Sequence, residues 1–452
     1  MAEQLPGYIQ SNVPNPASNR APWYKNTAPT YAGIFLWFVF WNEVGKLGMS
    51  QAGLGVSLVA LLVAALMCHY LFYLVPGLLG MKTGRPLYIV GTSTFGAMGG
   101  LLMPGFLMGV LQFGWLGVNI FFSSTLLVQG LGLPQAAFPI LCILWGVAAA
   151  FIGLKGIQYV AKVATYLPFI PITVLLVMFF KTGLAASQFH PVAADPAAGS
   201  KGAWLLMISY VVGFFATAGA AGVDFGMNNR DSRDVKRGGL IGIALAIAFS
   251  AGMALFAVAG AHALKPELQS YVFTEIMGIF LGPQLAGIFL VALTIAAFPP
   301  ACFSSFIAAN SFKTTLPQVN PFVSVGIGAI ISILIAITGW AGNLVAMFGL
   351  IGASFGPVCG AMAVEYFLNG FKWVGPRAGF NIPGWGAWLC GFIVGILPND
   401  ALVAWKITQP GQFEFLQPAP VVAFLVGAVV YLILAKLGLE SKVLPLENKE
   451  TH

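Results

Sequence analysis

The sequence predicts an all-α polytopic membrane protein with about twelve transmembrane helices. Hydrophobic residues make up 58% of the 452 residues and charged residues only 8%, whereas about a quarter of a soluble domain is charged. The mean hydropathy is +0.88. Apolar runs long enough to cross ~30 Å of hydrocarbon recur along the whole chain. These observations exclude a water-soluble catalytic domain, and the short connections between the runs place any function inside the membrane.

The apolar runs define the expected helices in chain order. We expect spans near residues 31–50, 53–80, 98–130, 136–153, 157–180, 204–224, 238–264, 279–311, 321–338, 342–368, 383–398 and 418–437. The run at 98–130 is too long for an upright helix and predicts a steep tilt. The expected units are an N-terminal tail (1–30), a first five-helix repeat (31–180), a second five-helix repeat (204–368), two additional helices (383–437) and a C-terminal tail (438–452).

The distribution of basic residues predicts the orientation. Most of the 21 Lys and Arg residues lie in connections on the same side as the N-terminus. The connections on the other side carry Lys181, Lys201, Lys265 and Lys406. Because cytoplasmic loops are enriched in Lys and Arg, we expect both termini in the cytoplasm, with the chain in the plasma (inner) membrane. The net charge of +7 is then a topology signal and predicts no nucleic-acid partner. The five cysteines lie in apolar runs without a CxxC pair, which favours neither disulfides nor a metal site.

The first span contains an unusual polar stretch from Asn42 to Gly48. Glu43 and Lys46 lie within this otherwise apolar run, and an ionisable group at the bilayer centre costs roughly 2.5–3.5 kcal/mol on insertion scales. Their i,i+3 spacing allows them to neutralise each other. Gly45 and Gly48 would let the helix open there, which predicts a broken helix that holds a solute or couples an ion. The alternative is an internal ion pair that only fixes helix packing.

A second stretch, Gly213–Asp224 in the sixth span, is rich in Gly and Ala. Small residues permit close helix contact, and the glycines permit a second break. Breaks in the first and sixth spans occupy corresponding positions of two five-helix halves. This placement is typical of inverted-repeat transporters with a binding site at the midplane. Close packing without a break is the alternative.

A third stretch, Gln112-Phe113-Gly114-Trp115 in the third span, combines an amide with a large ring. Gln112 and Trp115 share one helix face because they are three residues apart. The pair suits a flat heterocycle that stacks on the ring and is read along its edge by the amide. A core tryptophan with Gln112 bonded to a neighbouring helix is an equal alternative.

Several of these motifs together resemble a known family. The resemblance rests on Gly80-Met81-Lys82-Thr83-Gly84, Phe95-Gly96 and Gln112–Trp115, then Thr217-Ala218-Gly219 with Asp224-Phe225, Ser304-Ser305 with Asn310, and Gly356-Pro357-Val358-Cys359-Gly360 with Glu365-Tyr366. In order and placement they resemble the nucleobase:cation symporter-1 family of the purine/cytosine permease type, from about Gly33 to Leu437. The resemblance implies a LeuT-like fold with inverted five-helix repeats and broken helices 1 and 6, and a substrate between helices 1, 3, 6 and 8.

The resemblance also implies residue roles. Trp115 and Phe215 would stack on the two faces of a base, and Gln112 would bond its edge. Phe40 would lie beside the substrate, with Asn42 and Glu43 as further contacts on the first helix. Backbone groups around Thr217 and Ala218, together with Asn310, would complete the substrate site. Ser304 and Ser305 would be sodium ligands.

The coupling ion is less defined, because Glu43 and Lys46 replace small or hydroxylic residues of the family pattern. Lys46, or Lys162 in the fifth span, would compete with sodium unless Glu43 neutralises it. Alternatively, Glu43 would carry a coupling proton, since burial favours the neutral carboxyl group. The Ser304-Ser305 pair favours sodium over the proton.

We therefore expect a secondary active transporter that imports a nucleobase or related flat N-heterocycle by alternating access. A hydantoin, allantoin, hydroxymethylpyrimidine or vitamin permease, proton-coupled or uncoupled, is the alternative. A membrane-embedded enzyme would need clustered acid–base residues, but the four histidines are scattered. No repeated pore motif predicts a channel, and no P-loop predicts an ATP-driven pump. We expect no cofactor, a small-molecule heterocycle and lipid as partners, and a monomer.

Overall fold

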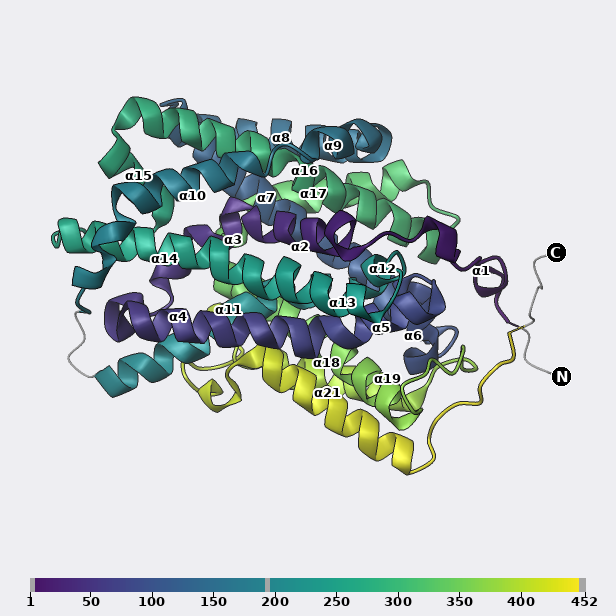
Figure 1. The fold of residues 1–452 in the computed structure, drawn as a ribbon. Coiled ribbons are helices and arrows are strands. Elements are labelled where there is room, and N and C mark those ends of the chain that lie inside the picture. Colours follow the sequence, from purple (N-terminus) through teal and green to yellow (C-terminus); the bar gives the residue numbers. More distant parts are fainter. Residues whose placement is uncertain (1–4, 192–195, 447–452) are drawn as a thin grey trace.

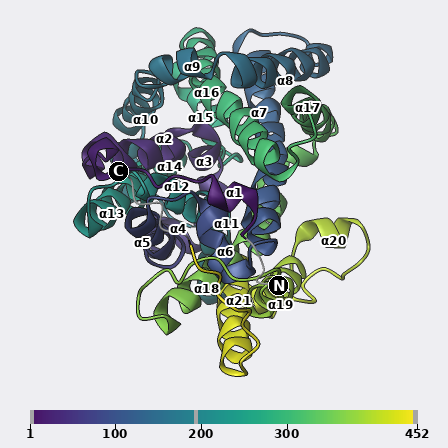
Figure 2. The same ribbon diagram turned by 90° about the vertical axis from the view of Figure 1, so that its right-hand side faces the viewer.

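The computed structural model describes residues 5–191 and 196–446, so the ends of the two predicted tails, 1–4 and 447–452, lie outside the described residues. Within these ranges the chain is mainly helical, and its extended pairing is limited to two isolated bridges. The long helices lie side by side as a bundle (Figure 1). In the end-on view α11 (Pro196–Ala220) lies near the middle, with α8 (Phe138–Lys155) and α9 (Ile157–Ala164) toward the upper edge and α21 (Ala419–Lys436) toward the lower edge (Figure 2).

The first half of the chain supplies five spans at the predicted places. They are the pair α2 (Thr27–Leu36) and α3 (Phe38–Asn42); the continuous run of α4 (Met49–Met67), η4 (Cys68–Tyr73) and α5 (Leu74–Thr83); η5 (Leu101–Phe106) with α7 (Leu107–Gly130); α8 (Phe138–Lys155); and α9 (Ile157–Ala164) with α10 (Phe169–Lys181). The fifth span is thus divided, because a turn that includes Pro168 separates α9 from α10.

The second half supplies seven more spans. They are α11 (Pro196–Ala220) with α12 (Gly222–Gly226); α13 (Ser232–Gly239), η8 (Leu240–Leu245) and α14 (Ala246–Leu264); α16 (Pro283–Thr315); α17 (Pro321–Ile337); α18 (Leu344–Leu368); α19 (Ile382–Ile396); and α21 (Ala419–Lys436). Among the described residues, eight helical stretches are long and apolar enough to cross a membrane and three more are shorter apolar helices. With the α2–α3 pair they give the predicted twelve spans, and the chain is a multi-pass membrane protein. The boundaries of the predicted repeats stay predictions.

The first span is interrupted, but upstream of the predicted point. Trp37 adopts an extended conformation (φ −63°, ψ 123°) between α2 and α3. The helix ends again at Glu43, and η3 (Val44–Lys46) leads to Gly48, which adopts φ +94° before α4 begins. The stretch from Asn42 to Gly48 therefore ends the span and turns the chain into the next one. The ionisable pair consequently lies at the end of the helix, whereas the prediction placed it in the middle of the span.

The sixth helix is interrupted at Ala221, between α11 and α12 and inside the predicted stretch. The glycines of that stretch serve close packing instead. A Cβ on Gly213 would lie 2.5 Å from the carbonyl oxygen of Phe348, and one on Gly219 would lie 2.7 Å from the Phe72 side chain. Both breaks of the fold are present, while Gly213 and Gly219 follow the packing alternative.

A short buried helix, α6 (Leu87–Phe95), lies between the second and third spans, where the sequence predicts only a connection. It packs against α18 and α19 (Figure 1, right). The Asp224 carboxylate of α12 accepts the Leu87 N–H at the start of α6. After α6, Gly96 adopts φ +91°, and a Cβ there would lie 2.3 Å from the Gly379 carbonyl oxygen. Only glycine fits this turn.

Both ends of the described chain reach the end of the bundle that carries α6, which we call the terminal end. Ile9 of α1 (Gly7–Gln10) and Leu444 pack into one buried cluster with Ile89 and Ala97. The segment before α2 is tied to this end as well: the Asn26 side chain donates to the Asn229 side chain. The two ends of the described chain therefore lie at the same end of the bundle. Which side of the membrane it faces stays a prediction.

Candidate substrate site

Four helices bring a group of rings together next to the interruption in the first span. This aromatic cluster consists of Phe40 on α3, Trp115 on α7, Tyr210 and Phe214 on α11, and Phe348 on α18. The Phe214 ring lies 4.7 Å from Phe40, 5.1 Å from Trp115 and 5.2 Å from Phe348, measured between ring centroids. All five side chains are buried, and Trp115 is the most accessible at 8% exposure. The cluster is therefore closed around Phe214.

The breaks and small residues of the sequence position these rings. The Tyr210 hydroxyl lies 3.1 Å from the carbonyl oxygens of both Val39 and Phe40, which fixes α3 against α11. Gly213 allows α11 to approach the backbone of α18 at Phe348, as described above. Phe348 in turn lies 4.9 Å from the Tyr210 ring and 5.5 Å from the Trp115 ring. Aromatic pairs at such separations are each worth about 0.5–1.5 kcal/mol beyond the area they bury.

Three polar groups lie at or beside the cluster. The Trp115 Nε1–H donates to the Thr217 hydroxyl at 3.2 Å. The Gln112 amide nitrogen contacts the Met108 sulfur at 3.6 Å, a weak acceptor. The Trp37 indole N–H is buried and has no partner in the part of the chain that the structure describes, and its ring lies 6.1 Å from that of Trp115. The site thus offers ring faces, an amide and an indole N–H, which suit a flat uncharged molecule with polar edges.

The structure does not bring Phe215 to Trp115. Phe215 is fully buried on the other face of α11, 5.7 Å from Phe35 and 5.6 Å from Tyr31. Helix register explains the difference, because residues three or four apart share a face and residues two apart do not. Thr217, whose hydroxyl accepts the Trp115 N–H, therefore lies on the same face of α11 as Phe214 and not on that of Phe215. The Ala218 carbonyl oxygen also belongs to the opposite side, where it accepts the Tyr31 hydroxyl.

The polar residues at the end of the first span have partners of their own. The Asn42 side-chain oxygen accepts the Thr274 N–H in the first turn of α15 (Phe273–Leu281). Glu43 Oε2 lies 3.3 Å from Lys46 Nζ, so the predicted neutralisation within the pair is confirmed. The Lys46 side chain is 49% exposed. Lys162 of the fifth span is also exposed and lies over the Tyr159 ring.

The eighth-helix candidates lie on different sides of α16. The Ser305 Cβ faces Gly153 of α8, where a Cβ would approach it to 2.9 Å, and its hydroxyl is 3.5 Å from the Ala301 carbonyl oxygen. Ser304 is buried at 9% exposure, whereas Asn310 is exposed. No hydrogen bond in the described part of the chain connects Ser304, Ser305 or Asn310 to α2 or α3. Their predicted roles stay predictions.

Sequence reasoning missed four ring residues next to the site: Trp37, Tyr210, Phe214 and Phe348. Phe214 carried a usable signal, since it lies three residues before Thr217 and hence on the same face. Trp37 carried none, because neither tryptophan nor its neighbours predict an interruption. Tyr210 and Phe348 join the site only through tertiary packing of α11 on α18.

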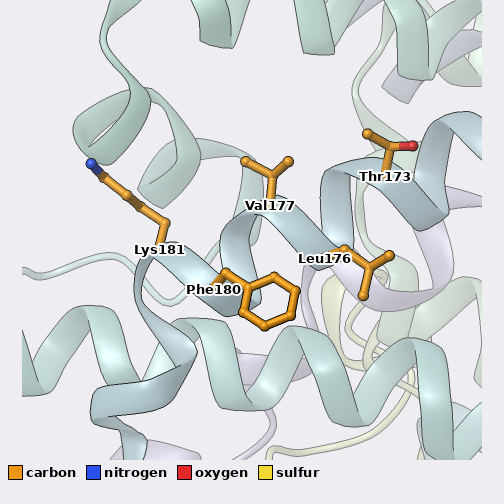
Figure 3. A pocket seen from close by; sticks show the side chains of 5 residues that line it. All are labelled: Thr173, Leu176, Val177, Phe180 and Lys181. Carbon is orange, nitrogen blue, oxygen red and sulfur yellow. The ribbon is translucent and has the colours of Figure 1, made fainter.

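Other features do not compete with this site. No group of three His, Cys, Asp or Glu side chains suited to a metal ion occurs among the described residues. A hollow of about 430 Å³ lies on the surface of α10 and is lined by Thr173, Leu176, Val177, Phe180 and Lys181 (Figure 3). All five residues come from this one helix, and none is a candidate substrate or ion residue.

Neither a protein-family model nor a curated protein sequence matches the chain. Solved structures match over nearly its whole length. An inward-facing structure of Mhp1 has a TM-score of 0.67 at 16% identity, covering 96% of this chain and 97% of that chain. Mhp1, a nucleobase-cation-symport-1 family transporter, in a closed conformation with bromovinylhydantoin bound, gives 0.63 at 16% identity and the same coverage.

A Na⁺-coupled sialic acid symporter, in a substrate-bound outward-open state, gives a TM-score of 0.57 at 15% identity, covering 97% of this chain and 93% of that chain. All of these structures are transporters. At such identities the similarity concerns the fold. The chain therefore has the LeuT-like fold that the family resemblance predicted, and this fold is the one found in Mhp1.

Proposed function

We propose that this protein is a secondary active transporter, and not an enzyme, that imports an uncharged flat N-heterocycle of the nucleobase or hydantoin type by alternating access. One observation carries the proposal: the aromatic cluster with Trp115 lies where the interrupted first helix meets the third, sixth and tenth spans. In this fold, sites near the midplane beside interrupted helices bind the transported solute. Mhp1, which shares the fold, was solved with bromovinylhydantoin bound.

The charge of the site supports an uncharged substrate. The five residues of the aromatic cluster carry no charge, and the Glu43 carboxylate beyond them is paired with Lys46. A carboxylate or cationic substrate would leave a buried charge without a partner, which costs far more than ring contacts return. When a neutral heterocycle binds, the Trp115 and Phe348 rings would instead exchange their contacts with Phe214 for contacts with the ligand. Gln112 and the Trp37 N–H would then bond its polar edge.

Cation coupling completes the proposal, with sodium favoured over the proton by the adjacent Ser304 and Ser305 hydroxyls. The protein would lie in the inner membrane with both termini in the cytoplasm, where its basic connections belong. Cytosine, purines, hydantoins, allantoin, hydroxymethylpyrimidine and related vitamins all fit a stacking site of this kind. We expect a monomer to be sufficient, because the cluster is built from one chain.

A thermal-shift panel on the purified protein tests the proposal. Nucleobases, hydantoins and B vitamins are added with and without sodium to the wild type, Trp115→Phe and Ser305→Ala, with Thr314→Ala on the same helix as the matched control. A ligand that binds the folded state stabilises it by about 2.7 kcal/mol at a hundredfold excess over Kd. We expect one flat uncharged compound to raise the melting temperature of the wild type and of the control. The increase should be smaller in Trp115→Phe. Sodium enhancement lost in Ser305→Ala supports sodium coupling. A shift produced only by charged solutes contradicts the proposal.

A further inference from the structure

A second site-like group lies at the terminal end, outside the aromatic cluster. The Glu365 side chain of α18 is 2% exposed and reaches α6. Its Oε2 lies 2.9 Å from the Ser93 hydroxyl and 2.8 Å from the Thr94 hydroxyl, whereas its Oε1 is buried and has no partner among residues 5–191 and 196–446. A buried ionised carboxylate needs donors on both oxygens or a paired cation. Within the described part of the chain Glu365 has neither.

Arg377 is the cation that faces Glu365, and two of its three nitrogens are used elsewhere, while its Nε–H has no partner among the described residues. Arg377 Nη2 donates to Glu440 Oε1 at 2.8 Å and its Nη1 donates to the Ser441 carbonyl oxygen, and it makes no hydrogen bond to Glu365. Tyr431 donates its hydroxyl to Glu440. Arg377, Glu440 and Tyr431 are the titratable groups that face Glu365 from the α18–α19 connection, the C-terminal segment and α21. Lys82 of α5 lies over the neighbouring Tyr366 ring and donates to the Phe371 carbonyl oxygen. The Arg377–Glu440 pair is neutral, so an ionised Glu365 would leave one uncompensated buried negative charge.

Hydrogen counting distinguishes the two protonation states. The Ser93 hydroxyl also lies 3.1 Å from the Val90 carbonyl oxygen, which can only accept. One hydroxyl carries one hydrogen and cannot donate to Val90 and Glu365 together. If Glu365 carries a proton on Oε2, it donates to Ser93, Ser93 donates to Val90, and Thr94 donates to Oε2. Each short contact then holds a hydrogen, and the remaining free oxygen Oε1 belongs to a neutral group.

We propose that Glu365 is a proton-binding site: it is held as a neutral carboxylic acid that donates to Ser93 while α18 is packed on α6. Separation of α18 from α6 removes the Ser93 and Thr94 partners and admits water, to which Glu365 releases its proton. Because the two states of this contact bind the proton with different affinity, proton binding and helix position are linked. The same helix carries Phe348 of the aromatic cluster. That the linkage serves transport rests on the proposed function; proton binding by Glu365 does not.

Infrared absorption of the purified full-length protein at pH 7, in a detergent without carbonyl groups, tests the assignment. A protonated carboxyl group gives a C=O stretch that is separate from the amide bands and shifts on exchange into D₂O. We expect this band in the wild type, its loss in Glu365→Gln, and its persistence in Glu414→Gln, an exposed carboxylate. A wild type without the band, or a Glu365→Gln variant that keeps it at full strength, overturns the proposal.

A second variant keeps the test decisive if Glu365→Gln does not fold. Ser93→Ala retains the carboxyl group but removes the acceptor of its hydrogen bond. We expect the band to move to higher wavenumber, because the carboxyl O–H loses its partner; an unmoved band overturns the proposal. The measurement needs no transported compound. A negative ligand panel would therefore refute the proposed function and leave the proton site standing. An infrared result against Glu365 would refute the proton site and leave the proposed function standing.

Discussion

The aromatic cluster and the group around Glu365 lie on the same helix, α18, and are held together in opposite ways. Phe348 and Glu365 are 17 positions apart in the numbering, roughly 25 Å along an α-helix. Around Phe348 the contacts are between rings, with centroids 4.9–5.5 Å apart. Around Glu365 they are hydrogen bonds with the Ser93 and Thr94 hydroxyls, next to the Arg377–Glu440 pair.

This difference suits the aromatic cluster to binding a ligand and the Glu365 group to holding α18 against α6. Ring contacts have broad geometric preferences, so a bound heterocycle can replace the contacts of Phe214 with similar ones of its own. Hydrogen bonds to a buried carboxyl group are directional, and leaving a buried polar group unpaired costs about 1–3 kcal/mol. In the proposed transporter the aromatic cluster would therefore open gradually around different flat molecules. The Glu365 contact instead favours two distinct states, formed or broken, which suits a link between helix position and proton binding.

The largest effect is expected from removing the centre of recognition. Trp115→Ala deletes a buried ring that contacts Phe214, Phe348 and Trp37, and large-to-small substitutions of this kind cost about 3–5 kcal/mol. We expect that loss in the free energy of unfolding, measured by denaturant titration in mixed micelles, together with loss of stabilisation by any ligand. Trp405→Ala, on a ring that is 60% exposed and stacks on Trp340 at 6.4 Å, is the matched control and should change stability by no more than about 1.5 kcal/mol. Equal effects of the two substitutions would contradict the assignment of the aromatic cluster.

A smaller and more selective effect is expected from two neighbouring phenylalanines. Phe214→Ala removes a ring that contacts Trp115 and Phe40, whereas Phe215→Ala removes one that contacts Phe35 and Tyr31. Both rings are buried, so both variants should be less stable. Only Phe214→Ala should also change ligand affinity, by about tenfold, since one aromatic contact is worth up to ~1.5 kcal/mol. Isothermal titration of each purified variant measures this. A tenfold change in Phe215→Ala with none in Phe214→Ala would restore the pair expected from the family resemblance.

Long apolar runs made most of the fold predictable, because a segment that crosses hydrocarbon must be helical to satisfy its own backbone. The sequence did not predict α6, because this helix is short and is flanked by Pro86 and Gly96, two residue types that are typical of a connection. Its burial comes from α18, α19 and the Asp224 carboxylate of α12. These partners are distant in the sequence, so no local sequence pattern predicts the burial of α6.

The site was predictable only in part, and the glycines show why. Gly45 and Gly48 suggested an opening of the helix, but a Cβ on Gly45 would lie 2.6 Å from the Tyr271 carbonyl oxygen and one on Gly48 would lie 2.7 Å from Ala203. Close approach and a positive φ account for both glycines. The interruption at Trp37 is stabilised by tertiary contacts of the rings around it, and its own residue type does not disfavour a helix strongly. Gln112 and Trp115 became candidates because an amide beside a large ring is unusual in an apolar span, whereas Thr217 became one only through the family resemblance.

The smallest effect is expected at the pair that seemed most conspicuous in the sequence. Lys46 is 49% exposed and Glu43 is 19% exposed, and exposed ion pairs contribute about 0.2–1 kcal/mol. Glu43→Gln and Lys46→Met should therefore each lower the free energy of unfolding by less than about 1 kcal/mol and leave the ligand-induced thermal shift in place, with or without sodium. Paired measurements at low and high ionic strength should converge, because salt screens an exposed pair. If Glu43→Gln instead abolished the sodium dependence or the pH dependence of ligand binding, coupling would belong to the end of the first helix. The comparison would then change, because the ion pair beyond the aromatic cluster, and not the Glu365 contact alone, would link charge to recognition.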